Sequence, residues 1–236
     1  MNSPHGIRQV QSPRFSTCMI LRGPCSLMIA GGNFRMDIQP YFHRLCELHS
    51  VAFATVDRDG HPHNRIADLF FCDGEKLYFY TARGKAFYEE LMHTGETAVT
   101  GLLDDRKMIR FTGKVQKVSQ RVLNHIFQEN PYLKKVYPGD SRYICEVFCI
   151  YQGCGEVFDF GSKTLTRAPF TFGGAALHGS HYFITDNCRQ CGLCAESCPQ
   201  HCILPGSSYV ILQEHCMHCG LCAESCPEEA IHLLSL

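Results

Sequence analysis

The sequence predicts an α+β protein in which an antiparallel β-barrel with peripheral helices is followed by a small cysteine-rich domain. Segments with strand character follow one another across Asp-Gly turns, and helical segments interrupt them only at intervals. Nine of the 16 cysteines lie between Cys188 and Cys226, so the end of the chain differs in composition from the rest. We therefore expect one domain over residues 36–160 and another over residues 181–236. A linker rich in Gly, Ser and Thr joins them at residues 161–180.

Residues 1–35 precede the first regular pattern, and we interpret them as a disordered extension. Their apolar pieces are short because Arg22, Gly23 and Pro24 interrupt them, so a secretory signal peptide is not expected. Met36 stands directly before the first helical pattern and is an alternative start of translation.

The regular pattern begins with a predicted helix over residues 36–50, which read MDIQPYFHRLCELHS. Ile38, Phe42, Leu45 and Leu48 recur at steps of three and four residues. This spacing is typical of one buried helix face.

Three strands follow this helix and form two successive hairpins. Asp-Gly pairs at residues 59–60 and 73–74 supply the turn chemistry between them. The predicted strands are residues 51–57 (VAFATVD), 63–71 (HNRIADLFF) and 76–81 (KLYFYT). Their content of β-branched and aromatic residues is typical of strands.

The second half of the barrel domain alternates helices with further strands. Gly95 closes the first of these helices, and Ser119 is predicted to cap the second. The helices are residues 83–95 and 119–130, and the strands are residues 97–103, 107–118, 142–153 and 155–161. Helices that interrupt an antiparallel order favour a barrel over a parallel α/β sheet.

The C-terminal domain contains one cysteine phrase twice. Both copies have the spacing C-x-x-C-x-x-C-x-x-x-C-P, and the nine residues CGLCAESCP are identical in the two. Three thiolates on one tight loop reach three irons of a cubane cluster, and the fourth cysteine serves the other cluster. We therefore predict two [4Fe–4S] clusters. One is held by Cys188, Cys191, Cys194 and Cys226, and the other by Cys216, Cys219, Cys222 and Cys198.

This region resembles the bacterial two-cluster ferredoxin module over residues 181–236. The segments HYFITD and SSYVILQ precede the two copies and are predicted to be its short strands. Zinc is the alternative, because soft thiolates also suit Zn²⁺. Zinc sites usually pair distant C-x-x-C units, so the spacing favours iron–sulfur. Cys202 lies outside the pattern and is interpreted as a small packing residue.

The first domain carries a second resemblance, in the segment VAFATVDRDGHPHNRIADLFFCDGEKLYFYTARGKAFYEEL. It is similar to the first half of the FMN-binding split barrels of the pyridoxamine 5′-phosphate oxidase-like superfamily, and the likeness covers residues 38–160. The two resemblances imply an antiparallel split β-barrel with peripheral helices, followed by a small ferredoxin-like two-cluster domain. They also imply that FMN lies at the interface of a homodimer formed by the barrel.

The same resemblance implies a phosphate site for FMN. Arg65 and Lys85 match its basic residues, and Thr81 and Arg83 flank the same loop. A hydroxyl, a guanidinium, an ammonium and the first N–H groups of a helix suit a dianionic phosphate. The alternative for each basic residue is a solvated surface charge. No catalytic residue is identified, and the features specific to pyridoxal phosphate chemistry are not found.

The composition argues against two classes of partner, nucleic acids and membranes. The net charge is −1, and no basic run with interleaved aromatic residues occurs, so nucleic acid is not an expected partner. No run of 18 apolar residues occurs, so a membrane helix is not expected either. Dense C-x-x-C spacing favours a reducing compartment, and we expect a cytoplasmic protein.

These observations predict a flavin-dependent oxidoreductase that passes electrons between two [4Fe–4S] clusters and FMN and reduces a small organic substrate. One alternative is a non-catalytic electron-transfer protein that serves a partner oxidoreductase. Another is a flavin-free sensor that uses the clusters structurally. The expected partners are a second copy of the chain and a redox partner protein or a small-molecule substrate.

Overall fold

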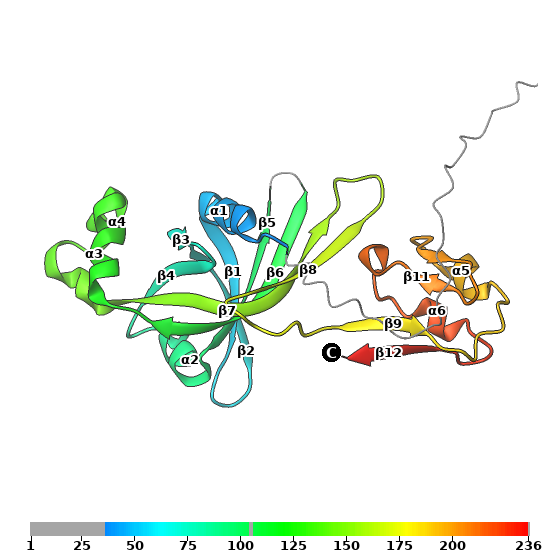
Figure 1. Cartoon of the computed structure of the whole chain (residues 1–236). Helices are drawn as coiled ribbons and strands as arrows, with labels where there is room; N and C mark the ends of the chain where they lie inside the picture. The colour runs from blue at the N-terminus through cyan, green and yellow to red at the C-terminus, as the bar shows by residue number, and fades with distance from the viewer. Residues whose placement is uncertain (1–35, 104–105, 236) are drawn as a thin grey trace, which may run out of the picture. The chain divides into compact units, whose positions relative to one another are not determined.

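The structure is a computed structural model that describes residues 36–103 and 106–235 of the chain (Figure 1). It confirms the predicted α+β class, with a curled antiparallel sheet and helices followed by a small cysteine-rich region. The extension predicted at residues 1–35 lies outside the described residues.

Eight strands form the main sheet. Their order is β2-β1-β5-β6-β7-β4-β3, and β8 pairs with β7. The strands are β1 Ser50–Val56, β2 Pro62–Asp68, β3 Phe71–Asp73, β4 Lys76–Ala82, β5 Glu96–Leu102, β6 Lys107–Lys117, β7 Cys145–Asp159 and β8 Thr166–Phe172. The long strand β7 pairs with β4 near its start and with β8 near its end. This lets the sheet curl around a core (Figure 1).

Helix α1, Gln39–Leu48, covers one part of that core. Its buried Phe42 lies 5.5 Å from Phe111 and 5.1 Å from Phe172, measured between ring centroids. Buried aromatic pairs of this kind stabilise a core beyond the area that they bury. A helix is thus confirmed within the predicted residues 36–50, and of its predicted inner face Ile38, Phe42 and Leu45 are buried and Leu48 is partly buried.

Helix α2, Ala86–Thr94, covers a second part of the core. Phe87 and Leu91 are buried, and the Phe87 ring lies 5.7 Å from that of Phe53. Gly95 ends the helix with a φ of 68°, which is the left-handed conformation that glycine favours. The predicted C-terminal cap is therefore confirmed.

A second, smaller core lies under helix α3, Gln120–Glu129. Ser119 stands at its N-cap, but the Ser119 side chain makes no capping hydrogen bond, so the predicted side-chain cap was wrong. Helix α3 ends before Pro131, and Pro131 begins the next helix, α4, Pro131–Val136. Proline suits this first position because the missing N–H would have no helical partner there.

The end of the barrel differs from the sequence prediction. Residues 142–153 and 155–161 were predicted as two strands, but residues 145–159 form the single strand β7, and residues 142–144 belong to the 3-10 helix η1, Gly139–Ile144. Gly155 lies within that strand. A Cβ at this position would lie 2.2 Å from the carbonyl oxygen of Arg110, so a larger residue would not fit there. Glycine at this position therefore marks a close approach of two backbones and not a turn.

The predicted linker at residues 161–180 was also wrong in part. It contains β8, whose Phe170 and Phe172 are buried against the first core. The segment was interpreted as a linker because it is rich in Gly, Ser and Thr. It nevertheless contains a strand in which alternate side chains face inward. The other domain boundaries stay predictions.

The cysteine-rich region is built from short elements. They are β9 Ser180–Ile184, α5 Leu193–Ser197, β10 Ile203–Leu204, β11 Val210–Ile211, the 3-10 turn η2 Gln213–His215, α6 Leu221–Glu224 and β12 Ile231–Ser235. Strand β9 pairs with β12, and β10 pairs with β11, both antiparallel. The two strands predicted before the repeats appear as β9 and β11. None of the helices in the described residues is long and apolar enough to cross a membrane.

Candidate functional site

Cysteines of both repeats line one cavity in the C-terminal region. Cys198 is the last cysteine of the first repeat and follows α5 directly. It lies there with the first three cysteines of the second repeat and with one further cysteine. The lining cysteines are Cys198, Cys202, Cys216, Cys219 and Cys222, and we call this space the cysteine cavity. The fold therefore brings four of the predicted ligands together across the two repeats.

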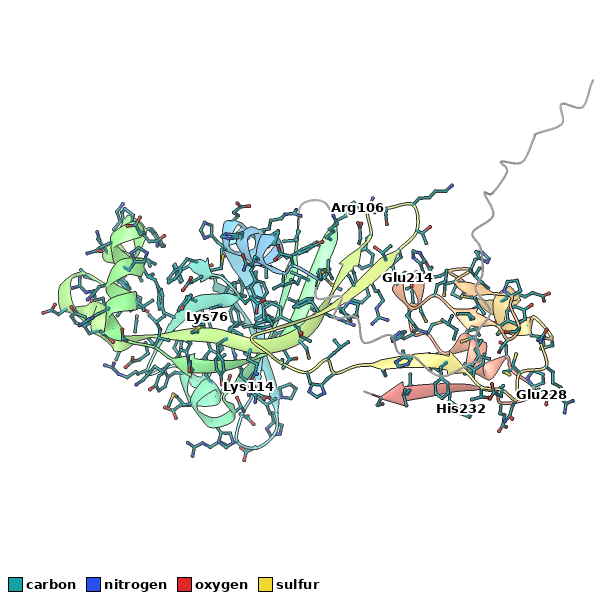
Figure 2. All side chains as sticks on the ribbon, in the orientation of Figure 1. Lys76, Arg106, Lys114, Glu214, Glu228 and His232 are labelled. Carbon is teal, nitrogen blue, oxygen red and sulfur yellow. The ribbon has the colours of Figure 1, made fainter. Side chains whose placement is uncertain are left out.

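The remaining cysteines of the first repeat lie near one another around α5. Burial and the neighbouring thiols of Cys188 and Cys191 raise the pKa of Cys194. Arg189 forms an ion pair of 3.1 Å with Glu228, which is labelled in Figure 2. This pair ties the loop of the first repeat to the segment after the last cysteine of the second repeat.

The backbone turns N–H groups toward the sulfurs in both repeats. In each repeat, two residues have a positive φ although neither is glycine. One lies two positions after the first cysteine, and the other lies three positions after the last cysteine. These residues are Gln190 (58°), His201 (49°), His218 (54°) and Glu229 (47°). The N–H of His218 donates to Sγ of Cys216 over 3.4 Å, and a backbone hydrogen bond from Gln190 lowers the pKa of Cys188. Hydrogen bonds of this kind stabilise thiolates, the form that ligates iron, so the residues present fit iron–sulfur clusters.

Each repeat also contains a glycine that faces a tyrosine. Gly192 and Gly220 precede the short helices with φ values of 83° and 84°. A Cβ at Gly220 would lie 2.9 Å from the hydroxyl of Tyr182, and one at Gly192 would lie 3.2 Å from that of Tyr209. Glycine is thus required here for conformation and for space. The two tyrosines were not among the predicted residues, although each occurs in a short segment just before a repeat.

Strand β8 contacts the start of the second repeat. Nη1 of Arg167 donates to the carbonyl oxygen of Cys216 over 3.0 Å. Nδ1 of His215 lies 3.0 Å from the carbonyl oxygen of Leu165. Arg167 also donates from Nε to Glu156 over 3.0 Å, so the guanidinium is fixed from both sides. The segment that was predicted as a linker therefore makes specific polar contacts with a cluster loop.

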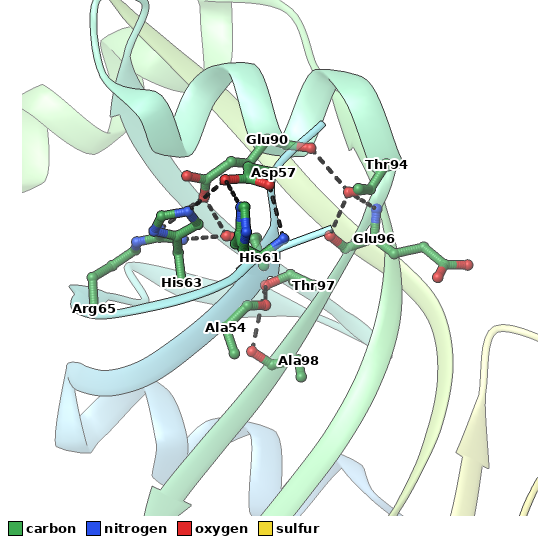
Figure 3. A network of polar contacts seen from close by, with 11 residues as sticks. Ala54, Asp57, His61, His63, Arg65, Glu90, Thr94, Glu96, Thr97 and Ala98 are labelled. Atoms are coloured by element: carbon green, nitrogen blue, oxygen red, sulfur yellow. Dashed lines mark hydrogen bonds and ion pairs between the residues drawn. The ribbon is translucent and has the colours of Figure 1, made fainter. Parts of the chain in front are cut away.

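Arg65, predicted to bind phosphate, is held within the barrel by neighbouring residues. Its Nη2 lies 2.8 Å from a carboxylate oxygen of Glu90 in α2, and it also donates to Thr55 (Figure 3). The guanidinium carbon lies 4.4 Å from the centre of the Phe87 ring. The register that pairs Phe53 with Arg65 directs this side chain to the core face of the sheet, where Glu90 neutralises it.

The other three predicted phosphate ligands lie at the junction of β4 and α2. Thr81 is buried in β4, and Nη1 of Arg83 forms an ion pair of 2.9 Å with Glu146. Lys85 is the N-cap residue of α2, is exposed and forms no ion pair with any described residue. Lys85 is therefore the free cation of this junction, and it stands where the N–H groups of the first helical turn point.

Sequence reasoning missed the acidic partners Glu90 and Glu146. Glu90 had a usable signal, because it falls with Phe87 and Leu91 on the buried face of α2. A carboxylate at such a position needs a cationic or hydrogen-bonding partner. Glu146 gave no comparable signal, since its position depends on the pairing of β7 with β4.

The turn between β1 and β2 carries a cluster of polar side chains. Asp57, Asp59 and His61 offer ligand atoms within 4.8 Å of one another, and Nε2 of His63 lies 3.0 Å from Asp57. The hydrogen bond from His63 lowers the pKa of Asp57. Asp57 also accepts from the backbone N–H of His61 (Figure 3) and from that of Asp59, so the cluster shapes the turn.

Comparison with known proteins agrees with both halves of this description. The family model described as pyridoxamine 5′-phosphate oxidase matches residues 42–142. The model described as 4Fe–4S binding domain matches twice, at residues 181–204 and 209–232. No curated protein matches the chain.

Several solved structures are similar to part of the chain. A NimC/NimA family protein from Clostridium acetobutylicum is 20% identical, with 58% of this chain and 95% of that chain covered and a TM-score of 0.48. A pyridoxamine 5′-phosphate oxidase-related, FMN-binding protein from Nostoc punctiforme is 16% identical, with 63% and 89% covered and a TM-score of 0.44. PhzG from Burkholderia lata, solved with tetrahydrophenazine-1-carboxylic acid, is 12% identical, with 56% and 79% covered and a TM-score of 0.43.

The two kinds of match fall on different parts of the chain. The first family model covers α2, α3 and strands β1 to β6 of the curled sheet but ends before β7 and β8, and the second model matches the two cysteine repeats. The chain thus joins a region that is similar to the pyridoxamine 5′-phosphate oxidase family to a region that is similar to 4Fe–4S binding domains.

Proposed function

We propose that this protein is a flavin-dependent oxidoreductase that passes electrons between two [4Fe–4S] clusters and FMN and reduces a small organic substrate. The observation that carries the proposal is the presence, in one chain, of a domain of FMN-binding type and a 4Fe–4S binding domain. Bound FMN supplies the ability to take up electrons singly and to deliver them as a pair. The chain's own residues bind and orient the two kinds of cofactor.

The clusters are assigned crosswise to the two repeats. The grouping in the cysteine cavity supports one set, Cys198, Cys216, Cys219 and Cys222. The other set consists of the remaining cysteines of the two repeats, Cys188, Cys191, Cys194 and Cys226. The N–H groups turned toward Cys188 and Cys216 favour their thiolate forms in the bound state.

The FMN phosphate is assigned to the junction of β4 and α2. Lys85 makes the direct ionic contact, because it is exposed and its ammonium has no ion-pair partner among the described residues. The first N–H groups of the nine-residue helix α2 add to the positive potential there. Thr81 and Arg83 flank the phosphate. Arg65 adds positive charge to the site, and its ion pair with Glu90 fixes the orientation of its guanidinium.

The cofactor content of the protein tests this function. Anaerobic purification should give about eight iron and eight acid-labile sulfide per chain, together with flavin absorbance bands. Reduced protein should then be reoxidised by a small organic acceptor. About four iron per chain, or zinc in place of iron, contradicts the cluster assignment. Cluster bands without flavin contradict the FMN assignment, and reoxidation by partner proteins alone favours the electron carrier.

Substitution of Lys85→Ala should release FMN. We expect flavin occupancy after gel filtration to fall by about tenfold or more, since one charge-assisted contact to a dianion contributes about 1.5–3 kcal/mol. Lys76→Ala is the matched control, because Lys76 is another exposed lysine, at the start of β4. Equal flavin occupancy in the two variants removes Lys85 from the site.

The barrel should form a homodimer through the sheet face that is opposite to its core. Val56, Ile66 and Leu102 point to that face from β1, β2 and β5, and they are 41%, 69% and 64% exposed. Large apolar side chains that are exposed on the same face of a sheet are candidates for contact with a partner. The double variant Ile66→Lys, Leu102→Glu should be monomeric in light scattering, where the native chain should have twice the mass. A native monomer at micromolar concentration contradicts the dimer.

A further inference from the structure

We propose that Cys202 donates a hydrogen bond from its thiol to the cluster ligand Cys198 and thereby makes the two clusters unequal in reduction potential. This inference rests on the cluster assignment of the proposed function. The two sulfur atoms lie 3.5 Å apart. Cys202 is only 3% exposed and lines the same cysteine cavity as the four assigned ligands.

Cys202 is in excess of what a cubane cluster needs. A [4Fe–4S] cluster takes one external thiolate on each of its four irons. The cysteine cavity contains five cysteines, and four of them follow the ligand spacing of the repeats. The fifth thiol therefore lies beside the ligands without an iron of its own.

The second repeat provides an internal comparison. Cys202 stands four residues after the last cysteine of the first repeat, and Ala230 stands four residues after Cys226. Both side chains are buried, at 3% and 0% exposure, and each is followed by a buried isoleucine, Ile203 or Ile231.

The two ligands have one backbone contact in common. The N–H of Ala230 donates to Sγ of Cys226 over 3.4 Å. The N–H of Cys202 likewise faces the sulfur of Cys198. The side-chain thiol is thus a contact that one ligand has and its counterpart lacks.

This thiol acts through the charge on the ligand sulfur. Its hydrogen bond withdraws charge from the thiolate of Cys198 and stabilises the more negative, reduced cluster. The cluster that contains Cys198 should therefore be reduced at a higher potential than the other, so that the first electron resides there. No covalent bond forms or breaks in this interaction.

Redox titration of the anaerobically purified holoprotein, followed by electron paramagnetic resonance, tests the inference. The native chain should show two separate reduction steps. Cys202→Ala makes the first repeat like the second and should shift one step to lower potential while the other stays. Cys202→Ser keeps a donor and should shift that step less. Ala230→Cys should raise the step that Cys202→Ala leaves unchanged.

Three outcomes would overturn the inference. In the first, Cys202→Ala retains all its iron and both midpoints are unchanged. In the second, Cys202→Ala and Ala230→Cys move the same step. In the third, Cys202→Ala loses about half its iron, because Cys202 would then be a ligand. Each of these is distinct from failure of the proposed function, which would appear as the absence of two clusters from the native chain.

Discussion

Replacing Cys198 with Ala should remove the cluster that is bound mainly by the other repeat. Cys198 lines the cysteine cavity with Cys216, Cys219 and Cys222, although at least 17 positions of chain separate it from them. A cluster that loses one of four thiolates in a region this small should not be retained through purification. We expect about four of the eight irons to be lost, and the remaining signal should be that of a single cluster.

Double variants identify which cluster is lost. If Cys198 and Cys216 serve one cluster, the variant Cys198→Ala, Cys216→Ala should retain about four irons, the same as either single variant. The variant Cys198→Ala, Cys188→Ala should then lose all of them. If each repeat bound its own cluster, the two double variants would give the reverse result. Iron analysis alone therefore separates crosswise from local ligation.

The repeat was predictable because its chemistry depends on spacing within a few residues. Three cysteines at steps of three residues define a loop, and the fourth cysteine is kept off that loop by the same geometry. What the sequence did not show was the role of Cys202. Its contact with Cys198 spans only four residues, yet its direction depends on the left-handed turn at His201. Conformations of this kind are rare for residues other than glycine, so no propensity rule predicts them.

The barrel was predictable in its class but less so in its last strands. Strand-forming residues and Asp-Gly turns predicted β1, β2 and β4, because those signals are local, but the single strand predicted at residues 63–71 ends at Asp68 and β3 follows as a separate strand. Strand β8 was missed because its inward residues, Phe170 and Phe172, lie among Gly, Ser and Thr that suggested a linker. Its assignment depends on pairing with β7 and on packing against α1, which are contacts between residues far apart in the chain.

The ionic partners of the candidate flavin site were the least predictable feature. Arg65 was assigned to phosphate from a resemblance, and the structure places Glu90 against its guanidinium. A sequence motif identifies a basic residue but does not state which acid faces it across the fold. The consequence is that a flavin defect in an Arg65 variant has two explanations, loss of a phosphate contact or loss of a buried ion pair.

Replacing Glu90 with Ala should destabilise the barrel by about 3 kcal/mol. The Glu90 side chain is 4% exposed and that of Arg65 is 22% exposed, so the substitution leaves a largely buried guanidinium without its counter-ion. Thr55 would also lose its hydrogen bond to the carboxylate. Denaturant unfolding of the holoprotein, followed by circular dichroism of the sheet, should show a lower midpoint with the same slope.

The double variant Arg65→Met, Glu90→Leu separates the two roles of Arg65. Because apolar side chains of similar size can replace a buried ion pair, this variant should regain most of the stability that Glu90→Ala loses. If Arg65 also contacts the FMN phosphate, the double variant should remain stable and yet bind FMN more weakly. Stable protein with native flavin occupancy would assign Arg65 to the fold alone and leave Lys85 as the principal anchor. A double variant as unstable as Glu90→Ala would show that the destabilisation does not come from the unpaired guanidinium.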